Sequence, residues 1–149
     1  MQLRLEPITK DNWRKAIKLN VDERQKSFVA PNYYSIIEAL FEPENLFAYA
    51  VYDGDEMVGF TMHGDDPGDP ENRYWIIRLM VDQKFQRQGY GRAIMEEVIN
   101  TLKKKLDRDA LYISFEPENA VARALYTSLG FQDTGLVMWE ETVFKLPLK

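Results

Sequence analysis

Alternating and continuous hydrophobic runs predict the strands of this chain. Residues 3–7 alternate between apolar and polar positions, which favours a short first strand. The runs 47–52 and 57–62 flank an Asp-Gly pair typical of a tight turn, so together they predict a hairpin. The run 75–81 is apolar on both faces apart from Arg78, which indicates a central strand that is covered on both sides.

Apolar residues at helical spacing predict four helices. The first covers about residues 9–21, with Thr9 as its N-cap, and the second covers about residues 32–41. The third, residues 94–106, repeats apolar positions on one face along its whole length. The fourth covers about residues 118–129 and ends at a glycine.

Three further strands complete the pattern. One is expected at residues 111–115 and two within residues 131–145. The predicted order is strand, helix, helix, three strands, helix, strand, helix, two strands. This order is an α+β (mixed α/β) arrangement with one βαβ crossover in its middle.

Composition indicates a single globular domain over residues 1–149. The chain is 45% hydrophobic and 29% charged, and its length is too short for two ordinary domains. We expect no membrane partner and a cytoplasmic location, because no run is long enough to span a bilayer and the first residues lack the apolar core of a signal peptide. The net charge of −5 argues against nucleic acid as a partner and suits a cationic substrate.

The residue types present narrow the chemistry. The chain has no cysteine, which excludes disulfides, thiolate metal ligands and a cysteine nucleophile. Its single histidine, His63, rules out a His-rich metal site and is the one residue through which a Ser-His-Asp triad could form. We therefore expect no metal.

A glycine-bearing loop follows the central strand and opens the third helix. Its residues are Gln86-Arg87-Gln88-Gly89-Tyr90-Gly91-Arg92. Backbone N–H groups at such a helix start converge on one point, and glycine lets an anion approach them, so the loop fits a phosphate or pyrophosphate cradle. It is neither a Walker A loop nor a Rossmann fingerprint, and a helix start eased by glycine is an equal alternative from these residues alone.

The fourth predicted helix carries a second chemical signal. One stripe, spaced by three, four and seven residues, bears an amide, a guanidinium and a phenol: Asn119, Ala122, Arg123 and Tyr126. A different stripe is apolar and is expected to face the core: Val121, Leu125 and Leu129. Taken alone, the polar stripe fits ordinary exposure with Tyr126 partly packed.

The two signals together resemble the GNAT superfamily of acetyltransferases. The pattern is a strand, Q-x-x-G-x-G, a helix, a strand and N-x-x-A-x-x-x-Y-x-x-x-G-F, carried here by Gln86, Gly89, Gly91, Asn119, Ala122, Tyr126, Gly130 and Phe131. Residues 25–35 and 75–82 look more particularly like the bacterial diamine and polyamine acetyltransferase branch. The resemblance implies a GNAT-like fold, whose mixed, mostly antiparallel sheet splays between the fourth and fifth strands beside a bulge and is flanked by about four helices.

The resemblance implies acetyl-coenzyme A as the cofactor. The glycine loop would hold its pyrophosphate, the strand edge at residues 79–81 would pair with its pantetheine arm, and a backbone N–H near Met80 would polarise the thioester. Asn119 would bond the arm, and Tyr126 would be the general acid that protonates the leaving thiolate. The implied cofactor-binding residues are Leu79, Met80, Val81, Gln86, Arg87, Gln88, Gly89, Tyr90, Gly91, Arg92, Asn119, Arg123 and Tyr126.

The base and the acceptor are less defined. Many similar proteins place a carboxylate at the position of Ile77, which cannot accept a proton here. The alternatives are His63, Glu116, Asp82 or loss of the proton through water. The carboxylates offered for a polycation are Asp22, Glu23, Glu38, Asp65, Asp66, Asp69 and Glu71, of which Glu23, Asp65 and Asp66 are the candidate substrate-binding residues.

The expected activity is direct acetylation of a small amine, with polyamines as the leading class. A protein N-terminus, a lysine and an aminoglycoside are alternative acceptors. A coenzyme A-binding module without catalysis is an alternative from another class, supported by Ile77 and opposed by Tyr126. Dimers are common among similar proteins, so a homodimer is part of the expectation.

Overall fold

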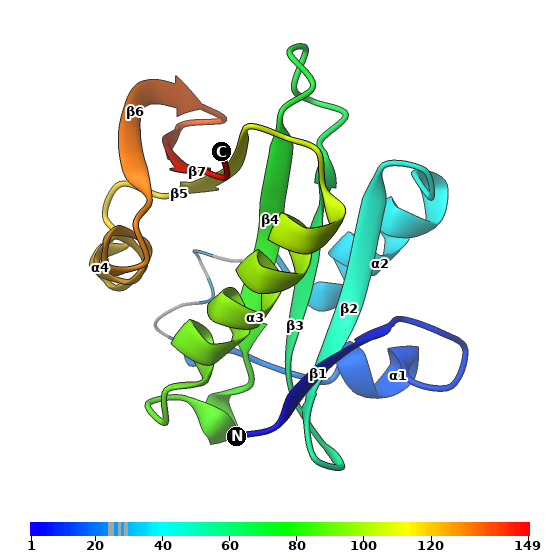
Figure 1. Cartoon of the computed structure of the whole chain (residues 1–149). Helices are drawn as coiled ribbons and strands as arrows, with labels where there is room; N and C mark the ends of the chain where they lie inside the picture. Colours follow the sequence, from blue (N-terminus) through cyan, green and yellow to red (C-terminus); the bar gives the residue numbers. More distant parts are fainter. Residues whose placement is uncertain (24–25, 27, 29) are drawn as a thin grey trace.

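The computed structural model describes residues 1–23, 26, 28 and 30–149, and Figure 1 shows the chain. The described residues form a seven-stranded sheet with four α-helices and a short 3-10 helix. The elements are β1 (Leu3–Pro7), α1 (Trp13–Ala16), α2 (Asn32–Phe41), β2 (Leu46–Asp53), β3 (Glu56–Asp65), β4 (Tyr74–Val81), η2 (Gln83–Phe85), α3 (Tyr90–Lys105), β5 (Ala110–Phe115), α4 (Ala120–Ser128), β6 (Gln132–Met138) and β7 (Glu141–Pro147). This confirms the predicted order of strands and helices.

The first helix is shorter than predicted. Only Trp13–Ala16 is helical, and Asn12 rather than Thr9 occupies the N-cap position. The chain leaves the helix because Asn20 is bound to the end of β4: its N–H donates to the Asp82 carboxylate at 2.9 Å, and its carbonyl accepts from Gln83 at 2.7 Å. Of the segment 25–35 that looks like the polyamine branch, residues 25, 27 and 29 lie outside the described residues.

The sheet is divided at its centre. Its strand order is β1-β2-β3-β4-β5-β7-β6, and all neighbours are antiparallel except β4 and β5. These two parallel strands pair at only two positions, Trp75 with Tyr112 and Ile76 with Ile113. The rest of β4 diverges from β5, so the predicted splay between the fourth and fifth strands is confirmed.

A bulge accompanies this divergence. Along β3, Met62 pairs with Arg78 and His63 pairs with Ile76, so Ile77 of β4 is left without a partner across the ladder. An extra residue of this kind bends its strand and increases the local twist. The bulge therefore lies where β4 turns away from β5.

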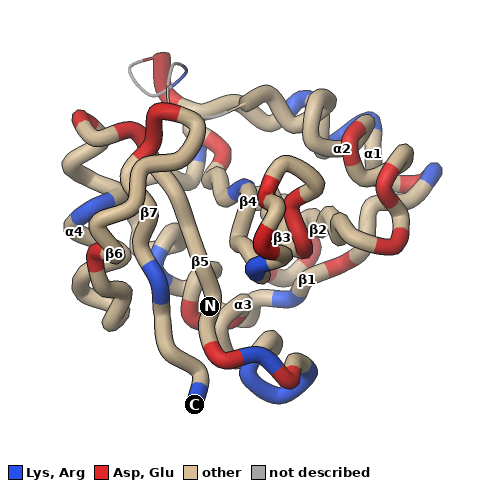
Figure 2. Tube along the Cα trace, turned by 90° about the horizontal axis from the view of Figure 1, so that it is seen from above, with Lys and Arg blue, Asp and Glu red and all other residues tan. Residues whose placement is uncertain are grey.

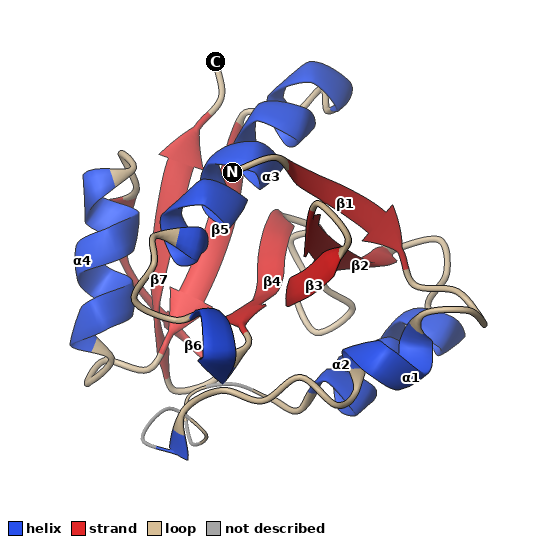
Figure 3. Cartoon of the chain, turned by 90° about the horizontal axis from the view of Figure 1, so that it is seen from below, coloured by secondary structure: helices blue, strands red, loops and turns tan. Residues whose placement is uncertain are grey.

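Hydrophobic clusters cover both faces of the sheet. Residues of α3 such as Ile94 and Val98 pack on one face together with Tyr126 of α4. Ala16 of α1 and Ile36 of α2 pack on the other face with residues of β3. Figure 3 shows α3 crossing one side of the sheet, with α1 and α2 on the opposite side.

Candidate active site

A cleft of about 1250 Å³ lies along the diverging edges of β4 and β5. Most of the residues predicted to bind the cofactor line it: Leu79, Met80, Val81, Gln86, Arg87, Gly89, Tyr90, Gly91, Asn119 and Tyr126. They come from a strand edge, a loop, a helix start and a second helix, which the splay of the sheet brings together.

The glycine loop enters α3 through left-handed backbone. Gly89 is the N-cap with φ of +86°, and Arg87 has φ of +63°. The cap makes no side-chain hydrogen bond, so the first amide groups of the helix keep the unsatisfied donors of a helix start. A Cβ added at Gly91 would meet nothing nearer than a Leu125 methyl at 3.9 Å, which leaves the approach to these amides open. The geometry fits an anionic group such as a pyrophosphate.

Beyond Ile76, the edge of β4 that faces β5 has no strand partner among the described residues. The direction of its backbone groups shows which N–H groups could bind a ligand in the cleft. The Met80 carbonyl points toward β3, because a Cβ added at Gly59 would lie 2.5 Å from it. Backbone groups alternate in direction along a strand, so Leu79 and Val81 direct theirs toward the cleft. Consistent with this, the Val81 carbonyl accepts from the Gln86 side chain at 3.0 Å. The backbone N–H expected near Met80 to bind the thioester is therefore that of Leu79 or Val81, not that of Met80 itself.

Tyr126 lies in the wall of the cleft, and its exposed fraction is 8%. Its ring packs against Phe115 at 5.5 Å and Phe131 at 5.8 Å between centroids. Burial, with a smaller contribution from Glu141, raises the pKa of Tyr126 to about 12. The phenol therefore keeps its proton at neutral pH and is available as a donor.

The predicted division of α4 into stripes is wrong in part. Val121 was assigned to the core face, yet 70% of its side chain is exposed, whereas Tyr126 of the polar stripe is buried. Asn119 accepts from the Ala122 amide at 3.1 Å and so caps α4. The helix packs on the core through Leu125 and Leu129, as predicted, and also through Ala122 of the polar stripe.

Three residues predicted to bind the cofactor make other contacts and do not line the cleft. Gln88 donates to the Lys84 carbonyl at 3.3 Å. Arg92 pairs with Glu96 and also contacts the Ser128 hydroxyl on α4. Arg123 stacks its guanidinium over Phe115 and Phe144 at about 5.5 Å. Arg92 and Arg123 thus have local structural contacts that account for their positions.

A group of carboxylates near Tyr126 was only partly predicted. Glu116 lines the cleft together with Glu118 and Glu141. Burial and the charges of these two neighbours raise the pKa of Glu116 above its ordinary value. Glu141 accepts from the Ser114 hydroxyl at 2.7 Å, which links β7 to β5. The sequence offered no local signal for Glu141, because its place depends on the long-range pairing of these strands.

His63 lies in a separate cavity. This cavity of about 250 Å³ is lined by His63, Tyr49 and residues of β1 and α3. His63 is buried, its Nδ1 is hydrogen-bonded to the Tyr74 hydroxyl at 2.7 Å, and its ring stacks on Tyr49 at 5.3 Å. Burial, assisted by the positive charge of Lys105, lowers its pKa to about 4. These contacts assign His63 to the interior of the protein and not to the cleft.

The three carboxylates proposed for the acceptor lie in different settings. Asp66 lines the cleft, and its side chain accepts from the Gly68 amide at 2.8 Å. Asp65 is paired with Arg108, with the shorter contact at 2.8 Å. Glu23 is exposed and pairs with Lys26 at 2.8 Å.

Of the other acidic candidates, some line the cleft and others are buried outside it. Asp22 and Glu38 line the cleft, and Arg78 approaches Glu38 to 3.5 Å. Burial raises the pKa of Glu38 despite this cation. Asp82 is buried and accepts from the Asn20 amide. Figure 2 shows acidic residues gathered on the connection between β3 and β4, which borders the cleft at Asp66.

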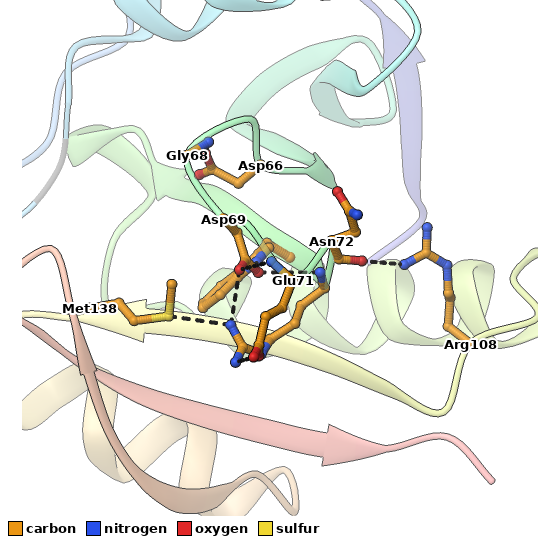
Figure 4. Close-up of polar contacts among 9 residues, drawn as sticks. Asp66, Gly68, Asp69, Glu71, Asn72, Arg108 and Met138 are labelled. Carbon is orange, nitrogen blue, oxygen red and sulfur yellow. Dashed lines mark hydrogen bonds and ion pairs between the residues drawn. The ribbon is translucent and has the colours of Figure 1, made fainter.

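The β3–β4 connection is organised around buried Asp69. Its carboxylate accepts from the Arg73 guanidinium at 3.0 Å, the Glu71 amide at 3.0 Å and the Trp75 indole at 2.9 Å. These bonds, several of them drawn in Figure 4, lower the pKa of Asp69 against the effect of burial. Asp69 is therefore a structural residue of this connection, although it was offered as a candidate for cation binding.

The described residues include neither a membrane-spanning helix nor a cluster of metal ligands. No helix there is long and apolar enough to cross a membrane. No group of three or more His, Asp or Glu side chains within the described part of the chain is placed to hold a metal ion.

Comparisons with known proteins identify a family and a shared fold. The family described as the acetyltransferase (GNAT) family matches residues 13–131. The chain is 27% identical over 143 residues to a spermine/spermidine N(1)-acetyltransferase of Bacillus subtilis, covering 91% of each protein. A 58-residue stretch, 39% of this chain and 38% of its relative, is 41% identical to a ribosomal protein alanine N-acetyltransferase of Escherichia coli.

A solved structure shares the fold over almost the full length. It is a spermidine N-acetyltransferase from Vibrio cholerae in complex with CoA and spermine, with a TM-score of 0.77 and 15% identity. The match covers 99% of this chain and 96% of that one.

Proposed function

Because this chain belongs to the acetyltransferase (GNAT) family and is an acyltransferase, we propose that it acetylates a primary amine of the diamine or polyamine class. The donor is acetyl-coenzyme A, and the amine attacks it directly within a ternary complex. The observation that carries the proposal is that one cleft combines the unpaired edge of β4, a helix start without a side-chain cap and a buried, protonated tyrosine.

The chain's residues fit the donor at three points. The amides at the start of α3 would hold the pyrophosphate, with Arg87 beside them. The open edge at Leu79 and Val81 would pair with the pantetheine arm and donate to the thioester oxygen. The bound acetyl-coenzyme A supplies an activated acetyl group whose leaving group is a thiolate.

Proton transfer is the demanding part of the reaction. An alkylamine with a pKa near ~10.4 is almost wholly protonated at pH 7, a handicap of roughly 4–5 kcal/mol. We propose that the Glu116 carboxylate accepts the amine proton, since its raised pKa and its place in the cleft suit that role. As the amine nitrogen bonds to the acetyl carbon and the carbon–sulfur bond breaks, the Tyr126 hydroxyl donates its proton to the departing sulfur.

A peptide N-terminus is a second candidate acceptor. The observation that favours it is the 41% identity to a ribosomal protein alanine N-acetyltransferase, although this covers only 39% of the chain. The polyamine class ranks first because its relative matches 91% of the chain and because several carboxylates line the cleft.

We further propose a cytoplasmic homodimer. Helix α2 presents exposed apolar side chains to solvent, among them Ile37, Leu40 at 71% and Phe41 at 82% exposure. Such an exposed apolar patch could pack against its own copy across a two-fold axis. Light scattering of the parent and of Phe41→Glu tests the proposed dimer. We expect a dimeric parent and a monomeric Phe41→Glu protein, and a monomeric parent would contradict the proposal.

The test of the proposed activity is thiol release from acetyl-coenzyme A across a panel of amines and peptides. We expect turnover with spermidine, spermine or a diamine. Turnover only with an alanyl peptide would transfer the assignment to the second candidate. No turnover, combined with a melting temperature still raised by coenzyme A, would indicate a non-catalytic binding module.

The role of Glu116 has its own test. Glu116→Gln should lower kcat/KM about 10²-fold or more. Glu118→Gln is the matched comparison: it removes one of the charges that raise the pKa of Glu116, so the acidic limb of the pH profile should move to lower pH. A Glu116→Gln enzyme with parental kcat/KM would remove Glu116 from the mechanism and favour proton loss through water.

A further inference from the structure

The hairpin between β6 and β7 directs a large aromatic side chain into the cleft. Met138 pairs with Glu141, so Trp139 and Glu140 alone form the turn. Both have left-handed backbone, with φ of +53° and +62°, as the two central residues of a type I′ hairpin turn require. Asparagine and glycine are the usual residues at such positions, and an indole there costs conformational strain. This chain nevertheless places Trp139 in the turn, and its side chain lines the cleft.

Contacts from the other half of the sheet hold this indole in place. Trp75 meets Trp139 edge-on, with ring centroids 5.1 Å apart and an interplanar angle of 63°. Trp75 itself is buried and fixed by its hydrogen bond to Asp69. Gly68 lies against the indole, since a Cβ added there would be 3.5 Å from the Trp139 ring nitrogen. The Trp139 ring is thus oriented from two sides.

The adjacent residue Met138 is tied to the same connection. The Arg73 guanidinium, which is bound to Asp69, contacts the Met138 sulfur at 3.6 Å (Figure 4). The hairpin and the β3–β4 connection therefore meet across the end of the cleft. The position of Trp139 is set by this junction and not by the hairpin alone.

Core packing does not account for Trp139. Its exposed fraction is 46%, whereas that of the Trp75 ring it touches is 1%. An exposed indole in a cleft offers a π-face that attracts a cation and an apolar surface for methylene groups. Asp66 lines the same cleft and is held beside Gly68, which places a carboxylate close to the indole.

We propose that Trp139 binds the distal, non-reacting ammonium of the acceptor and so selects diamines and polyamines over monoamines. The proposal rests on the proposed function of the same cleft. The reacting nitrogen must lose its proton, but a second amine with a pKa near ~10.4 stays charged at pH 7. Trp139 would recognise that second charge and the methylene chain that leads to it, and would not take part in proton transfer.

The experiment compares two acceptors of equal length, hexylamine and 1,6-diaminohexane, in the parent, Trp139→Leu and Trp139→Phe. With Trp139→Leu we expect KM for the diamine to rise about three- to tenfold, and KM for hexylamine to change less than about twofold. Trp139→Phe keeps a weaker π-face and should fall between. KM for acetyl-coenzyme A should not change in either variant.

Glu140→Asn is the matched control. Asparagine tolerates left-handed backbone, so this variant alters the turn without removing the indole. We expect it to keep the parental preference for the diamine.

Equal rises in KM for both amines, or no rise, in a folded Trp139→Leu protein would overturn the inference while the proposed function stands. If Trp139→Leu does not fold, an unchanged preference in Trp139→Phe would overturn it in the same way. A parent that acetylates neither amine nor any polyamine would overturn the proposed function, and this inference with it.

Discussion

The only histidine of the chain should make folding stability depend on pH. His63 is buried against Tyr49 and Tyr74, and its pKa falls from 6.5 to about 4. The native protein therefore keeps the ring neutral at a pH where the unfolded chain binds a proton. Because the folded pKa is the lower one, the stability associated with the neutral ring is present above pH 6.5 and is lost as pH falls from 6.5 toward 4.

The magnitude follows from the size of the shift. The change in the pKa of His63 from 6.5 to about 4 corresponds to roughly 3 kcal/mol of unfolding free energy when the pH window has been crossed completely. At pH 5 the unfolded ring is nearly all protonated and the folded ring nearly all neutral, so about 2 kcal/mol should be lost relative to pH 7. That is a large share of the usual 5–15 kcal/mol stability of a domain.

Urea unfolding at pH 7 and pH 5 measures this loss. His63→Asn is the comparison, since its amide can still bond the Tyr74 hydroxyl but cannot titrate in this range. The parent should lose about 2 kcal/mol more than His63→Asn between the two pH values. An equal loss in both proteins would refute the burial argument.

The same variant tests whether His63 takes part in catalysis. Because His63 lies outside the cleft, folded His63→Asn should retain acetylation, and a fall of 10²-fold in kcat would return His63 to the mechanism.

Three other substitutions test the cleft and the strand beside it. Tyr126→Phe should lower kcat about 10²-fold with little change in KM for acetyl-coenzyme A, and an unchanged kcat would remove Tyr126 as the acid. Gly91→Val should weaken coenzyme A binding more than about tenfold by calorimetry, since its Cβ fits but its methyl groups occupy the cradle; unchanged affinity would place the pyrophosphate elsewhere. Gly59→Ala should lower the free energy of unfolding by about 1–3 kcal/mol in urea, because its Cβ would lie 2.5 Å from the Met80 carbonyl and 3.1 Å from Ile94. A Gly59→Ala protein as stable as the parent would show that β3 and β4 can separate without cost.

The elements that the sequence predicted well are those encoded locally. The hairpin of β2 and β3 follows from two apolar runs around an Asp-Gly turn, and Asp53 does pair with Glu56 across it. Helix α3 follows from its regular apolar face, and its start follows from Gly89, which has the left-handed backbone that glycine favours. The loop and the central strand that precedes it also come together in one cleft, as their adjacency in sequence implies.

The parts that the sequence did not predict depend on contacts between distant segments. Helix α1 ends early because Asn20 is bound by Asp82, sixty-two residues away. The placement of His63 in the interior depends on a neighbour from β4, Tyr74. Trp139 gave no local signal, since only the junction of its hairpin with the β3–β4 connection brings it into the cleft.

The bulge at Ile77 connects the fold to the choice of base. It leaves Ile77 without a ladder partner where β4 begins to diverge from β5, and Ile77 packs with the cluster on the α1 and α2 side. An isoleucine there gives β4 no proton acceptor at the position where the sequence resemblance led us to expect a carboxylate. The opposite wall of the cleft carries two carboxylates, because Glu116 follows β5 and Glu141 begins β7, the strand paired with β5. If Glu116 is the base, it lies on the same side of the cleft as Tyr126. Both proton transfers would then involve residues on the β5 side of the cleft, opposite the β4 edge that is proposed to bind the cofactor. Replacing Ile77 by glutamate in a Glu116→Gln background should then restore part of the lost kcat/KM, and no recovery in a folded double variant would contradict this exchange of roles.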